Sequence, residues 1–384
     1  MELWPFIPQR GLTESLEWLT DVIRCKAGED RVALRHLPRQ TFQARCFLDP
    51  EEYGRAKAFS RSQSQEFLMP MWPLCHNVGN LLWGAVSIAG EFDPRFFSGQ
   101  VVIWEDSSKW EVANVESVDG SALTLVSELS RGYTNAALAP VQVVRFAQAP
   151  DFRVGTSDIK EVDLRTLSIG ALQLTSSAEP VIYRGLHVLM DDNILVSQLR
   201  ERHFREVDET DNRTGIIAAK EVYSNAETAT VMSWHPLTRA ELYVTLEWIH
   251  TRKGRRHAFW YRSHNADFLP LSALGPNTTP GESGTDYIEV ERVDTLADLV
   301  PFDILIERTD GARRFYRVQA TREPSSGRTA LVLAGNAGPQ WTLPEIARIS
   351  FLVCVRFDAD RIEIRHTVGG AATVSVPVVE VPAP

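Results

Sequence analysis

The chain has 384 residues, of which 44% are hydrophobic and 23% are charged, and its formal net charge at pH 7 is -10. This length allows about two or three domains with large cores, and the acidic balance argues against a nucleic-acid-binding surface, which needs a basic stripe. The 4 cysteines are widely spaced without a CxxC pair, which is typical of reduced thiols in a cytoplasmic protein. We expect no signal peptide, since no basic segment precedes an apolar run, and no membrane span, since no stretch of about 18 apolar residues occurs.

The first elements in chain order form a predicted β-hairpin. Val22 and Ile23 suit a strand, although Leu16, Leu19 and Ile23 would also fit a short amphipathic helix. We favour the strand because Gly28 then turns the chain into a second β-rich run, RVALRHL. This hairpin leads into a strand–helix–strand unit.

The strand–helix–strand unit occurs twice, over residues 42–72 and 231–261. Each helix is expected to begin at a capping box, which pairs Asp49 with Glu52 and Thr238 with Glu241. Apolar residues then recur at helical spacing and predict a stripe that lies on a sheet. The stripe residues are Tyr53, Ala56 and Phe59 in the first copy and Leu242, Thr245 and Trp248 in the second.

Each unit is followed by a run of short β-rich segments, over residues 98–146 and 302–357. Turn signals such as Asp119-Gly120 and Asp310-Gly311 separate these segments, which predicts a small barrel or sandwich. The two runs end alike, in VVRF and VCVRF. Because two modules recur in the same order, the sequence predicts a tandem duplication.

The second copy is expected to open with a hairpin of its own. In LRERHFREVDETDNRTG, residues 199–215, Gly215 takes the position that Gly28 has in the first copy. The stretch from Asp208 to Gly215 resembles a calcium loop only loosely, because it lacks the DxDxDG register and the closing glutamate. It therefore predicts a polar hairpin tip. Residues 157–169 and 358–381 predict the strands that finish the two halves.

A search for catalytic or metal-ligating residues finds no pattern with the required spacing. His76 and His264 each follow the repeated aromatic strand, but neither has a Cys, Asp or Glu at metal-ligand spacing. No HExxH, GxSxG, Walker A or GxGxxG sequence occurs. We therefore expect no catalytic residue, no bound metal and no cofactor, and we interpret both histidines as turn-forming or partly buried.

A basic cluster lies between the helix and the strand of the second unit. Its members are Arg252, Lys253, Arg255 and Arg256. Contact with nucleic acid is one interpretation, and an exposed loop that contacts an acidic neighbouring subunit is the other. We favour the subunit contact because the whole chain is acidic.

The chain also has 10 tryptophans, which leaves a sugar-binding interpretation open. In that interpretation Trp341 and Tyr316 would lie exposed on the second barrel and contact a receptor glycan. Tryptophans buried in sheets or at subunit interfaces are the commoner case. Tyr316 also falls at the position of Trp110 in the first barrel, which favours shared core packing.

These segments resemble a known family. The strand followed by DPEEYGRAKAF and FLMPMW, the VVRF and VCVRF endings, and YRGLHVLMDDN before a hairpin are similar to the distal tail and tail-tip (minor tail) proteins of long-tailed bacteriophages. In that family a β-sandwich with one flanking helix builds a ring beneath the tail tube. The resemblance implies a structural role without catalytic residues, although typical members have one such core and this chain has two.

The sequence therefore predicts a mainly β, α+β fold in which a β-sandwich with one flanking helix is duplicated and each copy is followed by a small β-barrel. The expected segments are residues 1–97, 98–180, 181–297 and 298–384. The resemblance implies a tail-tip or baseplate component in the virion tail, made in the host cytoplasm. Its expected partners are other copies of itself in a trimeric or hexameric ring, the tail tube protein, and hub and receptor-binding proteins, without nucleic acid or membrane. The alternative is a carbohydrate-binding module of the tail that recognises a receptor.

Overall fold

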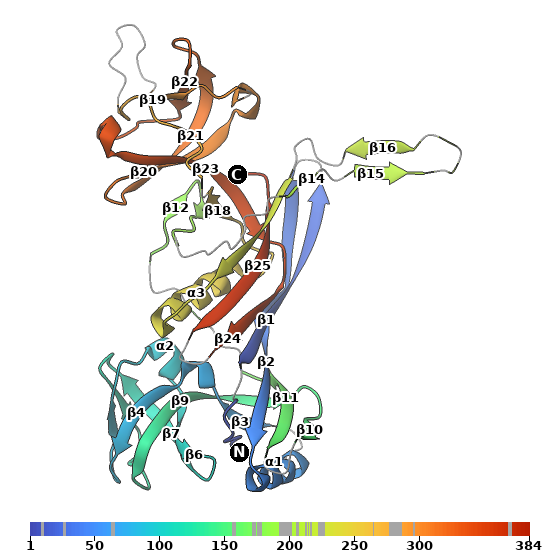
Figure 1. Cartoon of the computed structure of the whole chain (residues 1–384), viewed down its shortest axis with the longest axis vertical. Helices are drawn as coiled ribbons and strands as arrows, with labels where there is room; N and C mark the ends of the chain where they lie inside the picture. Colours follow the sequence, from blue (N-terminus) through green and yellow to red (C-terminus); the bar gives the residue numbers. More distant parts are fainter. Residues whose placement is uncertain are drawn as a thin grey trace. The chain divides into compact units, whose positions relative to one another are not determined.

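The computed structural model describes residues 1–384 except 9–10, 26–27, 63–65, 156–158, 171–173, 175–178, 192–201, 205–206, 212, 214, 216, 222–226, 264, 276–285, 295 and 368–370. The fold is mainly β: long runs of antiparallel strands are interrupted by short helical segments (Figure 1). This is the predicted fold class.

The first part of the chain forms the predicted hairpin, helix and strand (Figure 1). β1 (Leu12–Cys25) and β2 (Gly28–Leu48) pair from Thr13 opposite Gln43 to Cys25 opposite Gly28. The choice of strand over helix at the start of the chain is therefore confirmed. α1 (Pro50–Ser62) and β3 (Phe67–Pro70) follow.

The predicted small barrel and closing strands of the first half come next. In chain order they are η1 (Trp72–Leu74), β4 (His76–Leu81), β5 (Ser87–Ala89), α2 (Pro94–Phe97), β6 (Gln100–Asp106), β7 (Lys109–Val118), β8 (Ala122–Leu125), β9 (Tyr133–Phe146), β10 (Asp151–Val154) and β11 (Lys160–Ser168). The turns fall where the sequence predicts them, because the Asp106 and Asp119 carboxylates accept hydrogen bonds from the backbone two and three residues further on.

The elements of the second half follow. They are β12 (Ile182–Tyr183), β13 (Leu186–His187), β14 (Arg202–Phe204), β15 (Val207–Thr210), β16 (Ala218–Glu221), β17 (Glu227–Trp234), α3 (Arg239–Arg252), β18 (Phe259–Arg262), β19 (Tyr287–Glu291), η2 (Leu296–Leu299), β20 (Phe302–Arg308), β21 (Arg313–Arg322), β22 (Arg328–Leu333), η3 (Leu343–Glu345), β23 (Ile346–Phe357), β24 (Arg361–His366) and β25 (Ala372–Glu380). β15 and β16 form a separate hairpin, but Asp208 to Thr210 belong to β15 and not to the predicted polar tip, of which residues 212 and 214 lie outside the described residues.

Both predicted capping boxes are present. In α1 the Glu52 amide donates to Asp49 Oδ1 at 2.7 Å, and the Asp49 amide donates to Glu52 Oε2 at 3.2 Å. In α3 the Glu241 amide donates to Thr238 Oγ1 at 3.2 Å, and the Thr238 amide donates to Glu241 Oε2 at 3.4 Å. These bonds satisfy amides that have no partner inside the helix, so both helices begin where the sequence predicts.

The order of strand pairing recurs between the two halves. In the first half β2 pairs with β1 and β11, β11 also pairs with β10 and β9, and β9 pairs with β3. In the second half β17 pairs with β14 and β25, β25 also pairs with β24 and β23, and β23 pairs with β18. We call these sets, with α1 and α3, repeat 1 and repeat 2. The recurrence is what the predicted duplication requires, although common ancestry of the two halves stays a prediction.

The chain divides into two compact units that do not follow the four expected segments. Unit 1 comprises Met1–Ala178, Asp192–His257 and Phe357–Val378, and unit 2 comprises Glu179–Asp191, Ala258–Arg356 and Val379–Pro384. Unit 1 thus combines the first half with α3, β17 and β24 of the second. The reason is that β24 pairs with β1, from Leu12 opposite His366 to Glu17 opposite Arg361, so the last strands of the chain complete a sheet begun by the first.

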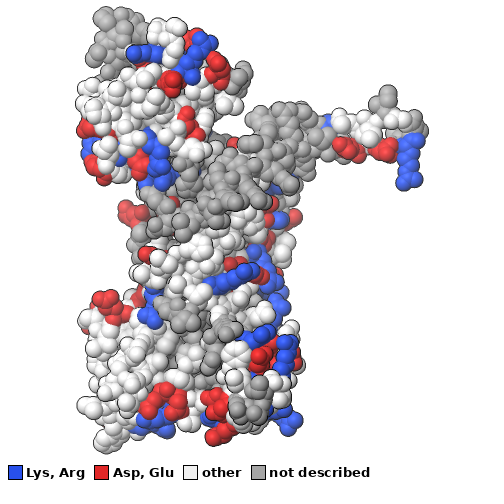
Figure 2. Space-filling view, in the orientation of Figure 1, with Lys and Arg blue, Asp and Glu red and all other residues white. Residues whose placement is uncertain are grey.

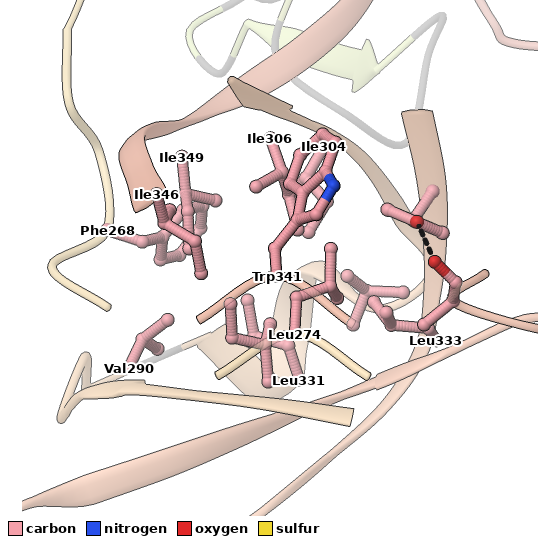
Figure 3. Close-up of a cluster of buried hydrophobic side chains, with 14 of the residues drawn as sticks. Phe268, Leu274, Val290, Ile304, Ile306, Leu331, Leu333, Trp341, Ile346 and Ile349 are labelled. Atoms are coloured by element: carbon pink, nitrogen blue, oxygen red, sulfur yellow. Dashed lines mark hydrogen bonds between the residues drawn. The ribbon is translucent and has the colours of Figure 1, made fainter. Parts of the chain in front are cut away.

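Unit 2 has its own core inside the second barrel (Figure 3). Trp341 lies among Leu274, Ile304 and Ile306, and the Tyr316 hydroxyl donates to the carbonyl of Ala337 at 2.7 Å. Inward-facing side chains from several antiparallel strands fill this core, as in other small barrels.

Candidate assembly surface

The described residues contain no group of three or more His, Cys, Asp or Glu side chains that could hold a metal ion. His76, which follows β3 and η1, packs against Phe92 and Phe97, with ring centroids 5.2 and 5.3 Å away. Burial, and then the charge of Arg239, lowers the pKa of His76 to about 4, so its imidazole is neutral at pH 7. The partly buried position expected for His76 is confirmed, and His264 lies outside the described residues.

A hollow of about 850 Å³ adjoins His76 in unit 1, between the segment around α2 and the start of α3. On one side of it Arg95 bonds both Asp93 and Glu247, and the Phe96 and Tyr243 rings stack with centroids 4.3 Å apart. These contacts join the first barrel to α3, which belongs to repeat 2. Burial raises the pKa of Tyr243 from the ordinary value of 10 to about 12, so this hydroxyl stays protonated even in alkaline solution.

The predicted basic loop lies at the end of α3, and its basic side chains are buried or half-buried rather than exposed. Arg252 is 2% exposed, and its guanidinium lies 4.4 Å from the centroid of the Trp248 ring. Burial lowers the pKa of Arg252 to about 10. The expectation that Arg252 is exposed is therefore wrong, because this residue ends the helix on its packed face and not within the loop.

The other three basic residues are half-buried. Lys253 takes the left-handed conformation, with φ 54°, that ends α3. The Arg255 guanidinium donates to the carbonyl of Asp358 at 3.2 Å, so this side chain contacts the turn before β24 of its own chain. The amide of Arg256 donates to the carbonyl of Lys253 at 3.4 Å. A subunit contact by Lys253, Arg255 and Arg256 stays a prediction.

Asp360, in the turn before β24, ties this loop to β1. Its carbonyl accepts a hydrogen bond from the Trp18 amide at 2.9 Å, and its carboxylate accepts from the Thr20 amide at 2.7 Å and from the Arg255 amide at 3.0 Å. Trp18 also packs edge-on against His250 of α3, with ring centroids 5.7 Å apart. One aspartate therefore fastens the hairpin of repeat 1 to the helix end and turn of repeat 2.

Glu14 forms a second contact across the β1–β24 pair. Gln40 Nε2 donates to Glu14 Oε1 at 2.6 Å, and His366 Nε2 lies 2.9 Å from Glu14 Oε2. All three side chains are buried. Burial by itself raises the pKa of Glu14, but the hydrogen bond and charge of His366 and the hydrogen bond of Gln40 outweigh it, so the net shift is downward. The ionised carboxylate is thus the form that this site stabilises.

These contacts define a junction between the repeats inside unit 1. β1 of repeat 1 pairs with the outer edge of β24 in repeat 2, and the adjoining part of the β1–β2 hairpin covers the end of α3. Sequence reasoning missed Glu14, Asp360 and His366. Of these three residues, only Asp360 could have been suspected from the sequence, because an aspartate in a turn commonly accepts hydrogen bonds from backbone amides.

The two residues that the sequence suggested for glycan binding are not exposed. Trp341 is 4% exposed and Tyr316 is 7% exposed, and both belong to the core of the second barrel. The expectation of an exposed pair at these positions is therefore wrong, while the core packing favoured for Tyr316 is confirmed. A carbohydrate-binding role stays a prediction without these two residues.

Because Trp341 fills a core, its replacement by alanine is expected to lower the free energy of unfolding of unit 2 by about 3–5 kcal/mol. The measurement is urea denaturation followed by circular dichroism. Trp83→Ala removes the same kind of side chain from a position in unit 1 that is 77% exposed. This control should lower the free energy of unfolding of unit 1 by less than about 0.5 kcal/mol. Equal losses from the two substitutions would contradict the assignment of Trp341 to the core.

Acidic and basic side chains are interspersed over the described part of the face shown in Figure 2. None of the described helices is long and apolar enough to cross a membrane. A scan against protein-family models and a search of curated proteins find no match to this chain.

Proposed function

We propose that the chain is a structural component of a bacteriophage tail tip or baseplate. In this role it forms a ring at the distal end of the tail tube and links the tube to hub or receptor-binding proteins. The observation that carries the proposal is the β1–β24 pairing, which joins two like sheet-and-helix repeats edge to edge within one chain. A contact between unlike edges of like modules repeats from one module to the next, and it closes into a ring when the rotation permits.

The junction between the repeats is of this unlike, or heterologous, kind. Repeat 1 contributes β1 and the adjoining hairpin, whereas repeat 2 contributes the edge of β24 and the end of α3. If the same step continues between chains and each step turns by about a sixth of a circle, three copies place six repeats around one axis. We propose this arrangement, a trimer with pseudo-sixfold symmetry, over a true hexamer.

The test is the mass of the purified full chain by light scattering, with negative-stain images of the same peak. We expect closed rings of three copies with a central opening as wide as a tail tube. Labelling the protein in intact phage particles should place it at the distal end of the tube. A protein that is monomeric in solution and absent from the tail tip would overturn the proposal.

A further inference from the structure

We infer that β14 and the β15–β16 hairpin of one copy dock on repeat 1 of a second copy, with β14 along the outer edge of β10 and the hairpin over the turn at residues 147–150. The inference rests on the proposed ring and identifies the two surfaces that would close it. Its basis is the junction within the chain, where repeat 1 already covers the equivalent surface of repeat 2.

In repeat 2 this surface is occupied by the β1–β2 hairpin. The edge of β24 pairs with β1, the turn at residues 358–360 receives the amides of Trp18 and Thr20, and the Trp18 ring covers His250 on α3. His250 is consequently only 8% exposed. Edge, turn and helix end are therefore all satisfied by one neighbouring repeat.

In repeat 1 the equivalent surface is open. β10 corresponds to β24, because both strands lead into matching hairpins, with Val154 opposite Lys160 and His366 opposite Ala372. Among the described residues β10 pairs with β11 alone, and Val154 is 65% exposed. Residues 147–149, in the turn before β10, are exposed, and so is Arg61, which aligns with His250 between the repeated units. An open strand edge is a ready site for pairing with another chain.

The matching elements of repeat 2 are the β15–β16 hairpin and β14, which among the described residues pairs with β17 alone. The hairpin lies in the chain between β14 and β17, beyond the point where these two strands pair. In the same way, the outer part of the β1–β2 hairpin lies beyond the pair formed by Leu16 and Gln40. Among the described residues β15 pairs only with β16, and residues 209–211 and 217–220 are exposed throughout. A two-stranded hairpin without further packing is marginally stable in water. Packing against a second copy would therefore stabilise this hairpin.

A second copy of the chain is the occupant that these observations favour. Among the described residues, β10 of repeat 1 has an open edge, and β14 and the β15–β16 hairpin of repeat 2 pair with no strand of another repeat. Inside the chain the corresponding edge and hairpin already fit one another. Because the two open elements belong to opposite repeats, the contact runs head to tail, and each copy donates one hairpin and accepts one.

Complementation between two variants of the full chain tests this arrangement. The acceptor variant carries Ala149→Lys and Val154→Lys, since lysines on an exposed edge oppose strand pairing without entering the core. The donor variant replaces residues 207–221 with a Gly-Ser linker. We expect each variant alone to be monomeric by light scattering, and an equimolar mixture to stop at the mass of two chains, because only one productive contact remains.

Leu82→Lys with Val126→Lys is the matched control, since these positions are 81% and 62% exposed on the first barrel and the charge change is the same. The control should assemble like the unmodified chain. Circular dichroism melting should show the same unfolding temperature for the acceptor variant, the control and the unmodified chain.

Three outcomes would overturn the inference. Rings that form equally well from the unmodified chain and from either variant would reject these surfaces while leaving the proposed ring intact. A mixture of the variants that stays monomeric would reject the head-to-tail contact between them. An unmodified chain that is monomeric at every concentration would reject the contact, and labelling of phage particles would then decide the proposed function separately.

Discussion

Replacing Gly254 with alanine is expected to lower the free energy of unfolding of unit 1 by about 2–4 kcal/mol. Gly254 follows α3 with φ +64°, a conformation that disfavours any residue with a Cβ. An added Cβ would overlap Asp360 Oδ1 and lie 3.1 Å from Asp360 Cα and 3.3 Å from Trp18 Cβ. The substitution therefore pushes apart the segments that Asp360 joins. Urea denaturation of the purified chain measures the loss.

A second glycine separates the effect of backbone conformation from the effect of crowding. Gly120 has φ +89°, and an added Cβ there meets no atom within 4 Å. Gly120→Ala is expected to cost only the conformational strain, about 1–2 kcal/mol. If the two alanine substitutions cost the same, the close approach of Asp360 to Gly254 does not contribute to stability.

Replacing Glu14 with alanine is expected to have a similarly large effect, about 3–5 kcal/mol. The substitution leaves His366 and Gln40 buried without the carboxylate that both contact. Glu17 on the same strand is the control. Its side chain is 43% exposed and lies 3.5 Å from Arg35, and loss of such a surface pair costs about 1 kcal/mol or less. Equal losses from Glu14→Ala and Glu17→Ala would show that the buried contact contributes nothing of its own.

The contribution of Glu14 is also expected to depend on pH. Its pKa is lower in the folded protein than in the unfolded chain, where a glutamate has a pKa of about 4.3. The unfolded state therefore binds the proton more readily, so the stabilisation is fully present above this pH and is lost as the pH falls through the folded pKa. Compared with Glu14→Gln, the advantage of the unmodified chain should shrink as the pH falls below about 4. An advantage that keeps growing below this pH would contradict the downward shift.

Much of the local structure could be predicted because its causes are local. Asp49 and Thr238 cap helices through amides only three residues away, and the box partners Glu52 and Glu241 follow at fixed spacing. The turn at Asp119 is set in the same way, by its own carboxylate and the next amides. Such contacts need no knowledge of the rest of the chain, so the residue types suffice.

The candidate site was predicted less well, since charge along the sequence does not reveal which face of an element is packed. Arg252 has three basic neighbours in the chain, yet it ends α3 on the side that carries Trp248. The aliphatic part of an arginine can be buried and its guanidinium can stack on an aromatic ring. A basic run therefore predicts the charge of a segment and not its exposure.

The sequence by itself determined the mainly β fold class, the two capped helices and the recurrence of a strand–helix–strand unit followed by short strands. Only the tertiary structure decided that β1 pairs with β24, that Glu14 meets His366, and that Asp360 receives amides from the opposite end of the chain. The physical reason is that backbone groups at a strand edge accept any strand of suitable length and shape. Which edges meet depends on where the hairpins and helices leave open edges after packing, and this information is spread over the whole chain.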